Sequence, residues 1–212
     1  TAGADRLMCV DLHTSQIQGF FDGPLDHLFA IPVLAEYIKS RVENPENVTV
    51  VSPDTGRVRV AEHWATLLGG APLAFVHKTR DINVPNQAVS KTVVGEIEGR
   101  SCVLIDDMID TANTLCKAAS ALKERGAERV LAYATHAVFS GGAVERLNES
   151  DIDQVVITDT ISLSEAAKNS PRIRQVSIAG LLAETIRRIS NEESVSYLFN
   201  EDLIQPNALF LL

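Results

Sequence analysis

The chain has 212 residues, and 28 acidic against 19 basic side chains give it a formal net charge of −9. This balance argues against a nucleic-acid partner bound through a general basic surface, although local cations can still hold a phosphate. The length suffices for one well-packed core, with room for part of a second domain. With no apolar run long enough for a bilayer and no recognisable signal peptide, we expect no membrane partner and a cytoplasmic location.

The three cysteines, Cys9, Cys102 and Cys116, are scattered along the chain, two of them within apolar strand patterns. Their spacing suggests neither a disulfide framework nor a zinc site, and it fits a reducing compartment.

Strand-like and helix-like patterns alternate along the chain. Apolar runs predict strands over 6–10, 48–52, 73–77, 93–97, 101–105, 130–135, 155–158 and 175–178. Helical spacing predicts helices over 34–41, 58–68, 114–125, 142–147 and 181–189. This alternation predicts an α/β fold with a mostly parallel sheet flanked by helices on both faces.

The first polar group of interest follows the first predicted strand, where the sequence reads Asp11-Leu12-His13. Carboxylate and imidazole ligands at a strand end are suited to a metal–nucleotide site. A lone histidine is more often a structural residue, so this pattern needs the company of other motifs.

A turn follows the second predicted strand. Ser52-Pro53-Asp54-Thr55-Gly56 has turn-forming residues and leads into a predicted helix. Arg57 comes next; it either adds a charged donor or partly blocks the approach of backbone to a phosphate.

The third predicted strand closes on two basic residues, Lys78 and Arg80. A basic pair at a strand end is usually solvated surface. The polar stretch 81–91 that follows, with Pro85 and two asparagines, has the composition of a mobile loop.

The most informative stretch is 103–115, in which an apolar strand runs into the adjacent carboxylates Asp106 and Asp107. A hydroxyl-rich turn, 110–114, then leads into a helix with apolar residues at i, i+3, i+4 and i+7. Backbone N–H groups at a helix N-terminus form a ready phosphate cradle. An acidic N-cap alone would explain Asp110 but not the acid pair, which suits sugar hydroxyls or a hydrated Mg²⁺. Asp54, Lys78 and Asp106 would all lie beyond strand carboxyl ends, where ligands of such sheets collect.

These motifs occur in one order from about residue 2 to 199, and together they resemble the ribose-phosphate pyrophosphokinases, or phosphoribosyl-pyrophosphate (PRPP) synthetases. The stretch 103–115 alone resembles the PRPP-binding motif that this family shares with phosphoribosyltransferases. The resemblance implies a type I phosphoribosyltransferase-like fold. It also implies that residues 1–30 are the C-terminal remnant of a first such domain, and that 31–212 form a second one with the ribose-phosphate site.

The resemblance assigns roles to individual residues. The catalytic residues it implies are Lys78, Arg80 and His13. The Mg²⁺ of Mg-ATP would be held by Asp11, His13, Asp22, Asp26 and Asp54. The pyrophosphate loop would be Asp54, Thr55 and Gly56, with Arg57 in place of the family's second glycine. An allosteric nucleotide or phosphate site between subunits would use Ser15, Gln18, Ser194 and Ser196.

The ribose 5-phosphate site implied by the resemblance spans the acid pair and the turn. Asp106 and Asp107 would hold ribose hydroxyls, and the 5-phosphate would lie on Asp110, Thr111, Ala112, Asn113 and Thr114. The family usually has glycine where this chain has Asn113, and often where it has Ala112. Asparagine tolerates a positive φ better than most residues, and alanine is small, so the turn is expected to survive.

The implied reaction converts Mg-ATP and ribose 5-phosphate to PRPP and AMP for nucleotide biosynthesis. The resemblance also implies a homo-oligomer in which dimers assemble into a hexamer. Two alternatives stay open: a phosphoribosyltransferase that uses PRPP, and a non-catalytic, synthetase-like regulatory subunit. The segment 10–26 argues against the first, since phosphoribosyltransferases lack it. The retained His13, Lys78 and acid pair argue against the second, whereas Arg57 and Asn113 keep it open.

Overall fold

The computed structural model describes residues 3–42, 44–79 and 90–199. Its centre is a seven-stranded sheet in the order β5-β4-β3-β6-β7-β8-β9, in which all neighbours are parallel except β4 and β5. The strands are β3 (Val48–Ser52), β4 (Leu73–Thr79), β5 (Ser90–Val94), β6 (Ser101–Ile109), β7 (Arg129–Ala137), β8 (Gln154–Thr158) and β9 (Ile173–Val176). The α/β class predicted from the sequence is confirmed.

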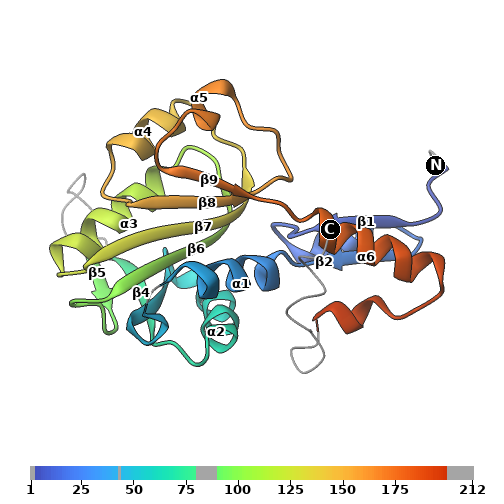
Figure 1. Cartoon of the computed structure of the whole chain (residues 1–212), viewed down its shortest axis with the longest axis horizontal. Coiled ribbons are helices and arrows are strands. Elements are labelled where there is room, and N and C mark those ends of the chain that lie inside the picture. The colour runs from blue at the N-terminus through green and yellow to red at the C-terminus, as the bar shows by residue number, and fades with distance from the viewer. Residues whose placement is uncertain (1–2, 43, 80–89, 200–212) are drawn as a thin grey trace.

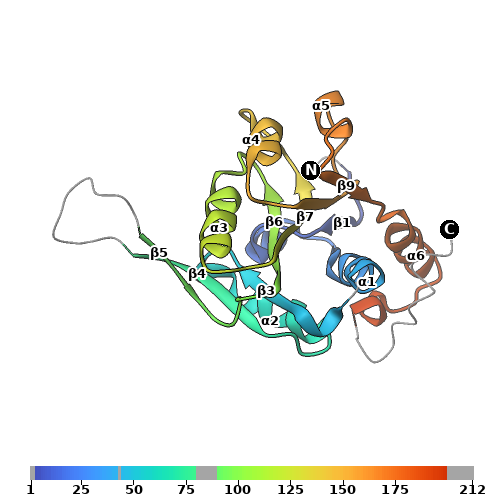
Figure 2. The same ribbon diagram turned by 60° about the vertical axis from the view of Figure 1, so that its left-hand side comes forward.

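Helices cover both faces of this sheet. They are α1 (Ile31–Arg41), α2 (Val58–Leu67), α3 (Asn113–Glu124), α4 (Ala143–Glu149), α5 (Glu165–Lys168) and α6 (Ala179–Ser190), with short 3-10 segments η1 (Ser15–Phe20), η2 (Pro45–Asn47), η3 (Thr55–Arg57) and η4 (Val195–Phe199). Successive strand residues face opposite ways, so Val103 packs with α1, α2 and α6, and Leu104 packs with α3 and α4. Figure 2 shows α3 and α1 on opposite sides of the sheet. Burial on both faces explains the continuous apolar runs of the central strands.

Strands β1 (Leu7–Val10) and β2 (Leu25–Leu28) form a separate parallel pair. This small sheet lies beyond the end of β7 (Figure 1), where His136 Nε2 is 3.1 Å from the carbonyl oxygens of Val10 and Asp11. The chain then enters α1 at Ile31. The division into domains at residues 30 and 31 stays a prediction.

Some predicted bounds were wrong, and each difference has a physical reason. Strand β5 covers 90–94 instead of 93–97, because Gly95 turns the chain at φ 122° beside β4. A Cβ at Gly95 would lie 2.6 Å from that of Ala74. Strand β9 lies two residues earlier than predicted, in register with β8 from Val155↔Ile173. Strand β2 was missed because its Asp26 and His27 interrupt the apolar pattern.

Within the described part of the chain, the helices are too short or too polar to cross a bilayer.

Candidate active site

Asp106 and Asp107 lie inside β6, three and two residues before the strand ends at Ile109, whereas the apolar run predicted a strand that ends at Ile105. The pairing of β6 with β3 stops at Val51↔Leu104, but its pairing with β7 continues to Ile109↔Ala137. Support from β7 therefore keeps Asp106 and Asp107 in extended backbone. On the side where β3 has ended, the turn that follows β3 comes against them.

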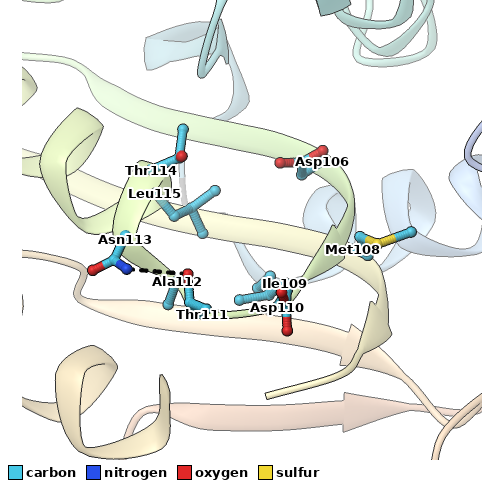
Figure 3. Close-up of a pocket in the computed structure, with 9 residues that line it drawn as sticks. All are labelled: Asp106, Met108, Ile109, Asp110, Thr111, Ala112, Asn113, Thr114 and Leu115. Carbon is cyan, nitrogen blue, oxygen red and sulfur yellow. Dashed lines mark hydrogen bonds between the residues drawn. The ribbon is translucent and has the colours of Figure 1, made fainter. Parts of the chain in front are cut away.

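The turn after β6 encloses a cavity of about 150 Å³, which Figure 3 shows lined by Asp106 and residues 108–115. The Asn113 side-chain amide donates to Thr111 Oγ1 at 3.2 Å across the turn. Ala112 is the N-cap of α3 and accepts from the Cys116 N–H at 2.9 Å. Because alanine has no side-chain oxygen, it cannot cap the backbone N–H groups in the first turn of α3. This start of the helix lines the cavity.

The positive φ of this turn falls on Ala112, at 62°, and Asn113 is already helical. The tolerance of asparagine for a positive φ is therefore not what preserves the turn. Alanine adopts the left-handed conformation at a cost, and tertiary contacts must compensate for it.

Two residues outside the turn hold it in place. The Ser140 hydroxyl donates to the Asp110 carboxylate, and the Ser140 N–H donates to the Asp110 carbonyl at 3.1 Å. The Arg146 guanidinium donates to the carbonyl of Thr111. Ser140 and Arg146 were not predicted from the sequence, since only the pairing of β6 with β7 brings the segment after β7 to this turn.

Arg57 binds both carboxylates of the acid pair. Its Nε lies 3.0 Å from Asp106 Oδ1, and its Nη2 donates to Asp107 Oδ1 at 2.7 Å. The side chains are largely buried, with 20% of Arg57 and 9% of Asp107 exposed. Arg57 is thus the cation that offsets the charge of the pair.

The second oxygen of Asp107 faces His13, whose Nδ1 lies 2.6 Å from Oδ2. Arg57 Nη2 is also near that nitrogen, at 3.1 Å. A carboxylate can only accept, so the proton belongs on Nδ1 of His13 and the Arg57 approach is a close contact without a shared proton.

The two carboxyls titrate in opposite directions. Burial raises the pKa of Asp106 to about 7, and the nearby negative Asp107 adds to the rise although Arg57 opposes it. Burial would also raise the pKa of Asp107, but the hydrogen bonds from His13 and Asp106 and the Arg57 charge outweigh it and lower that pKa. Near neutral pH the pair therefore carries between one and two negative charges.

The predicted metal ligands are not gathered into one cluster, and the described residues hold no group of three or more His, Cys, Asp or Glu suited to a metal ion. The Asp11 carboxylate is buried and accepts from the Ala30 N–H at 3.0 Å and from Thr135 Oγ1 at 2.5 Å. Asp26 forms a two-bond ion pair with Arg6, at 2.6 and 2.9 Å.

The remaining two predicted ligands differ in setting. Asp22 is exposed. Asp54 caps η3 by accepting from the Gly56 N–H at 2.9 Å, which fixes the predicted pyrophosphate loop, with Thr55 inside it, as a short 3-10 turn. Mg²⁺ commonly keeps several waters and takes one or two carboxylates plus substrate phosphates, so a dispersed donor set fits an ion that arrives with a nucleotide.

Of the predicted catalytic residues, Lys78 lies in β4 opposite Lys91 of β5. Arg80 and most of the predicted loop 81–91 lie outside the described residues. The predicted allosteric residues form local contacts: Gln18 Nε2 donates to the Ser15 carbonyl at 3.1 Å, and the Ser194 carbonyl accepts from Arg188 at 3.1 Å. Ser196 lies in η4. Within the described chain no hydrogen bond joins the first pair to Ser194 or Ser196.

A larger cavity, of about 290 Å³, opens where the two sheets meet. Its lining includes the acid pair and Arg57. His13 and Gln18, from the segment between β1 and β2, and Trp64 of α2 also line it. Asp106 also lines the cavity at the turn. The two cavities therefore adjoin at the acid pair.

The fold and the site together define an α/β protein whose parallel sheet carries an acid pair and a helix-starting turn at one carboxyl edge. Residues 71–200 match the sequence profile of the phosphoribosyl synthetase-associated domain. The chain belongs to this family.

Relatives agree with this assignment. The chain is 62% identical over 209 residues to a ribose-phosphate pyrophosphokinase of Neisseria meningitidis serogroup A, covering 99% of this chain and 62% of the relative. It is 56% identical over 201 residues to one of Bifidobacterium longum, covering 94% of this chain and 59% of the relative. A crystal structure of phosphoribosylpyrophosphate synthetase from Mycobacterium smegmatis matches with a TM-score of 0.81 and 50% identity, over 90% of this chain and 60% of that one. The chain thus spans about three fifths of the length of these relatives.

Proposed function

We propose that this chain carries the ribose 5-phosphate half of a ribose-phosphate pyrophosphokinase. The reaction transfers the pyrophosphoryl group of ATP to ribose 5-phosphate and yields PRPP and AMP. The observation that carries the proposal is the sharing of Asp106 by two adjoining cavities, one at the uncapped start of α3 and one beside Arg57 and His13. A sugar phosphate needs both features side by side: an anion site for its phosphate and hydrogen-bond acceptors for its hydroxyls.

The 5-phosphate would lie at the turn 110–114. Free N–H groups at a helix start donate to phosphate oxygens, and the helix dipole favours the negative charge. The Asn113 amide and the hydroxyls of Thr111 and Thr114 add donors. Ser140 and Arg146 hold the turn in this shape before a ligand arrives.

The ribose hydroxyls would donate to the acid pair, which leaves the anomeric carbon directed toward the cavity beside Arg57. In the reaction, the anomeric hydroxyl oxygen forms a bond to the β-phosphorus of ATP. The bond from that phosphorus to the oxygen bridging to the α-phosphate breaks, AMP leaves with the bonding electrons, and the hydroxyl proton passes to solvent or a nearby base. Catalysis of this kind depends mainly on positioning and on neutralising phosphate charge.

Basic residues of this chain supply part of that neutralisation. Lys78 in β4 and Arg80 after it are proposed to bind the transferring phosphates, and His13 to bind near the nucleotide. Mg²⁺ bound with ATP would neutralise further charge, and Asp54 and Asp11 would offer it carboxylate oxygens, although Asp11 Oδ2 already accepts from the Ala30 N–H and Thr135. The proposed assembly is a homo-oligomer located in the cytoplasm.

Two measurements on the full chain test the proposal. Calorimetry should show binding of ribose 5-phosphate, and Asp107→Asn should weaken it roughly ten-fold or more, as expected for the loss of a charge-assisted acceptor. Circular dichroism of the variant should be unchanged. Normal affinity in a folded Asp107→Asn variant would remove this carboxylate from the site.

Chromatographic detection of AMP from ATP and ribose 5-phosphate tests the reaction itself. Lys78→Ala should lower kcat far more than it raises KM, because its contact strengthens in the transition state. Binding of ribose 5-phosphate without any AMP formation would agree with a chain that carries the ribose 5-phosphate half alone, and it would keep the non-catalytic, synthetase-like subunit as the alternative. Consumption of PRPP with a nucleobase would indicate a phosphoribosyltransferase.

A further inference from the structure

We propose that Arg57 is a movable counter-ion that couples the two halves of this site. It neutralises the acid pair while the sugar position is empty, and it transfers to the phosphates of the pyrophosphoryl donor when ribose hydroxyls take its place. The inference rests on the proposed function, and it names Arg57 as a residue that binds the phosphates of the donor.

The oxygens of the acid pair are already engaged. Asp106 Oδ1 accepts from Arg57 and the Asp107 N–H, Asp107 Oδ1 accepts from Arg57, and Asp107 Oδ2 accepts from His13. Sugar hydroxyls that bind these oxygens must compete with the guanidinium for them. A ligand whose hydroxyls take the two oxygens that hold Arg57 therefore releases Arg57.

The position of Arg57 in the fold decides which anion its side chain can bind once it is released. Arg57 is the last residue of the 3-10 turn η3. The N–H of the preceding Gly56 donates to the Asp54 carboxylate. A guanidinium offers five donors in a planar fork, which suits carboxylate and phosphate oxygens equally well. A phosphate that approaches this turn is therefore the natural second partner for the same side chain.

Burial of Arg57 and Asp106 affects the free energy of this exchange. Arg57 and Asp106 are each 20% exposed, so neither charge is left fully to solvent. An incompletely solvated guanidinium that loses its carboxylates is stabilised by a new anion more than a solvent-exposed one would be. Sugar binding and phosphate binding should then support each other, and by linkage the support is reciprocal.

The test uses Arg57→Gln in the full chain, with Arg59→Gln as the matched control. Arg59 is exposed on α2, two residues further along. Calorimetry with ribose 5-phosphate should show tighter binding to Arg57→Gln, by roughly five-fold or more, since the competitor for the acid pair is gone. The affinity for 2-deoxyribose 5-phosphate should tighten less, because that sugar has one hydroxyl fewer to replace the guanidinium, and a merely structural role would not separate the two sugars.

The second arm titrates inorganic pyrophosphate into protein saturated with ribose 5-phosphate, so that the turn 110–114 is already filled. Arg57→Gln should bind pyrophosphate roughly ten-fold more weakly than wild type, and Arg59→Gln should match wild type. Arg57→Lys should recover part of the pyrophosphate affinity, because it keeps the charge but not the fork.

The outcomes separate the two proposals. Weaker or unchanged ribose 5-phosphate binding in a folded Arg57→Gln variant would overturn the competition, and unchanged pyrophosphate affinity would overturn the transfer, while the proposed function stands in both cases. A wild-type chain that binds no ribose 5-phosphate would overturn the proposed function, and this inference with it.

Discussion

The two neighbouring halves of the site are built in different ways although they share Asp106. The turn 110–114 takes its shape from consecutive residues and the start of α3, with Ser140 and Arg146 as braces. The acid-pair crevice instead joins Asp107 to Arg57, 50 positions away, and to His13, 94 positions away. The phosphate half should therefore withstand changes at the junction of the sheets, whereas the sugar half depends on how β1 and β2 are held against β7.

The largest effect should come from cutting that junction at Thr135. Thr135→Val keeps the shape but removes the donor to the buried Asp11 carboxylate, which should lower the free energy of unfolding by about 1–3 kcal/mol. Urea denaturation at pH 8 measures the loss. The affinity for inorganic phosphate, a probe of the turn, should not change.

Thr135→Ser is the matched control, because it retains the hydroxyl and should stay close to wild type. An equal loss in both variants would show that packing, and not the hydrogen bond to Asp11, holds the junction.

The next effect is a pH dependence at the residue that both halves share. The pKa of Asp106 is raised to about 7 in the folded protein, so the folded state holds this proton more firmly than the unfolded chain does. Its contribution to stability is therefore present at low pH and is lost as the pH rises through about 7.

Asp106→Asn removes this dependence. Relative to wild type, the variant should gain about 1–3 kcal/mol in free energy of unfolding between pH 5 and pH 8, because only wild type must ionise a buried carboxyl. Denaturant unfolding of both proteins at the two pH values gives the difference. A constant difference would mean that Arg57 already stabilises the ionised form fully.

The smallest effect concerns the backbone of the turn itself. Ala112→Gly should raise the free energy of unfolding by less than about 1 kcal/mol, since relief of the left-handed conformation slightly outweighs the lost methyl group and the entropy of glycine. Ala121→Gly, at an equally buried position within α3, should lower it by about 1 kcal/mol. Thermal unfolding that shifts the same way in both variants would contradict the strain at Ala112.

Much of the fold was readable because its signals are local. The apolar runs at 48–52 and 101–105 and the helical spacing after Thr114 predicted β3, most of β6 and α3, and the alternation predicted the sheet. The errors fell where a neighbouring strand sets the bound: β7 extends β6 to Ile109, and β4 determines that β5 ends at Val94, before Gly95. Pairing partners are distant in sequence, so no window of residues contains them.

By itself, the sequence determined the acid pair, the turn after it and the family resemblance, because each depends on residue types at short fixed spacing. Only the tertiary structure decided what binds the acid pair. Arg57 could be read as a donor or as an obstacle, and the meeting of the η3 turn with β6 made it the counter-ion of Asp106 and Asp107. It likewise directed Asp11 inward to Thr135. Charge neutralisation and desolvation act between groups close in space, so they are settled when the strands assemble and not before.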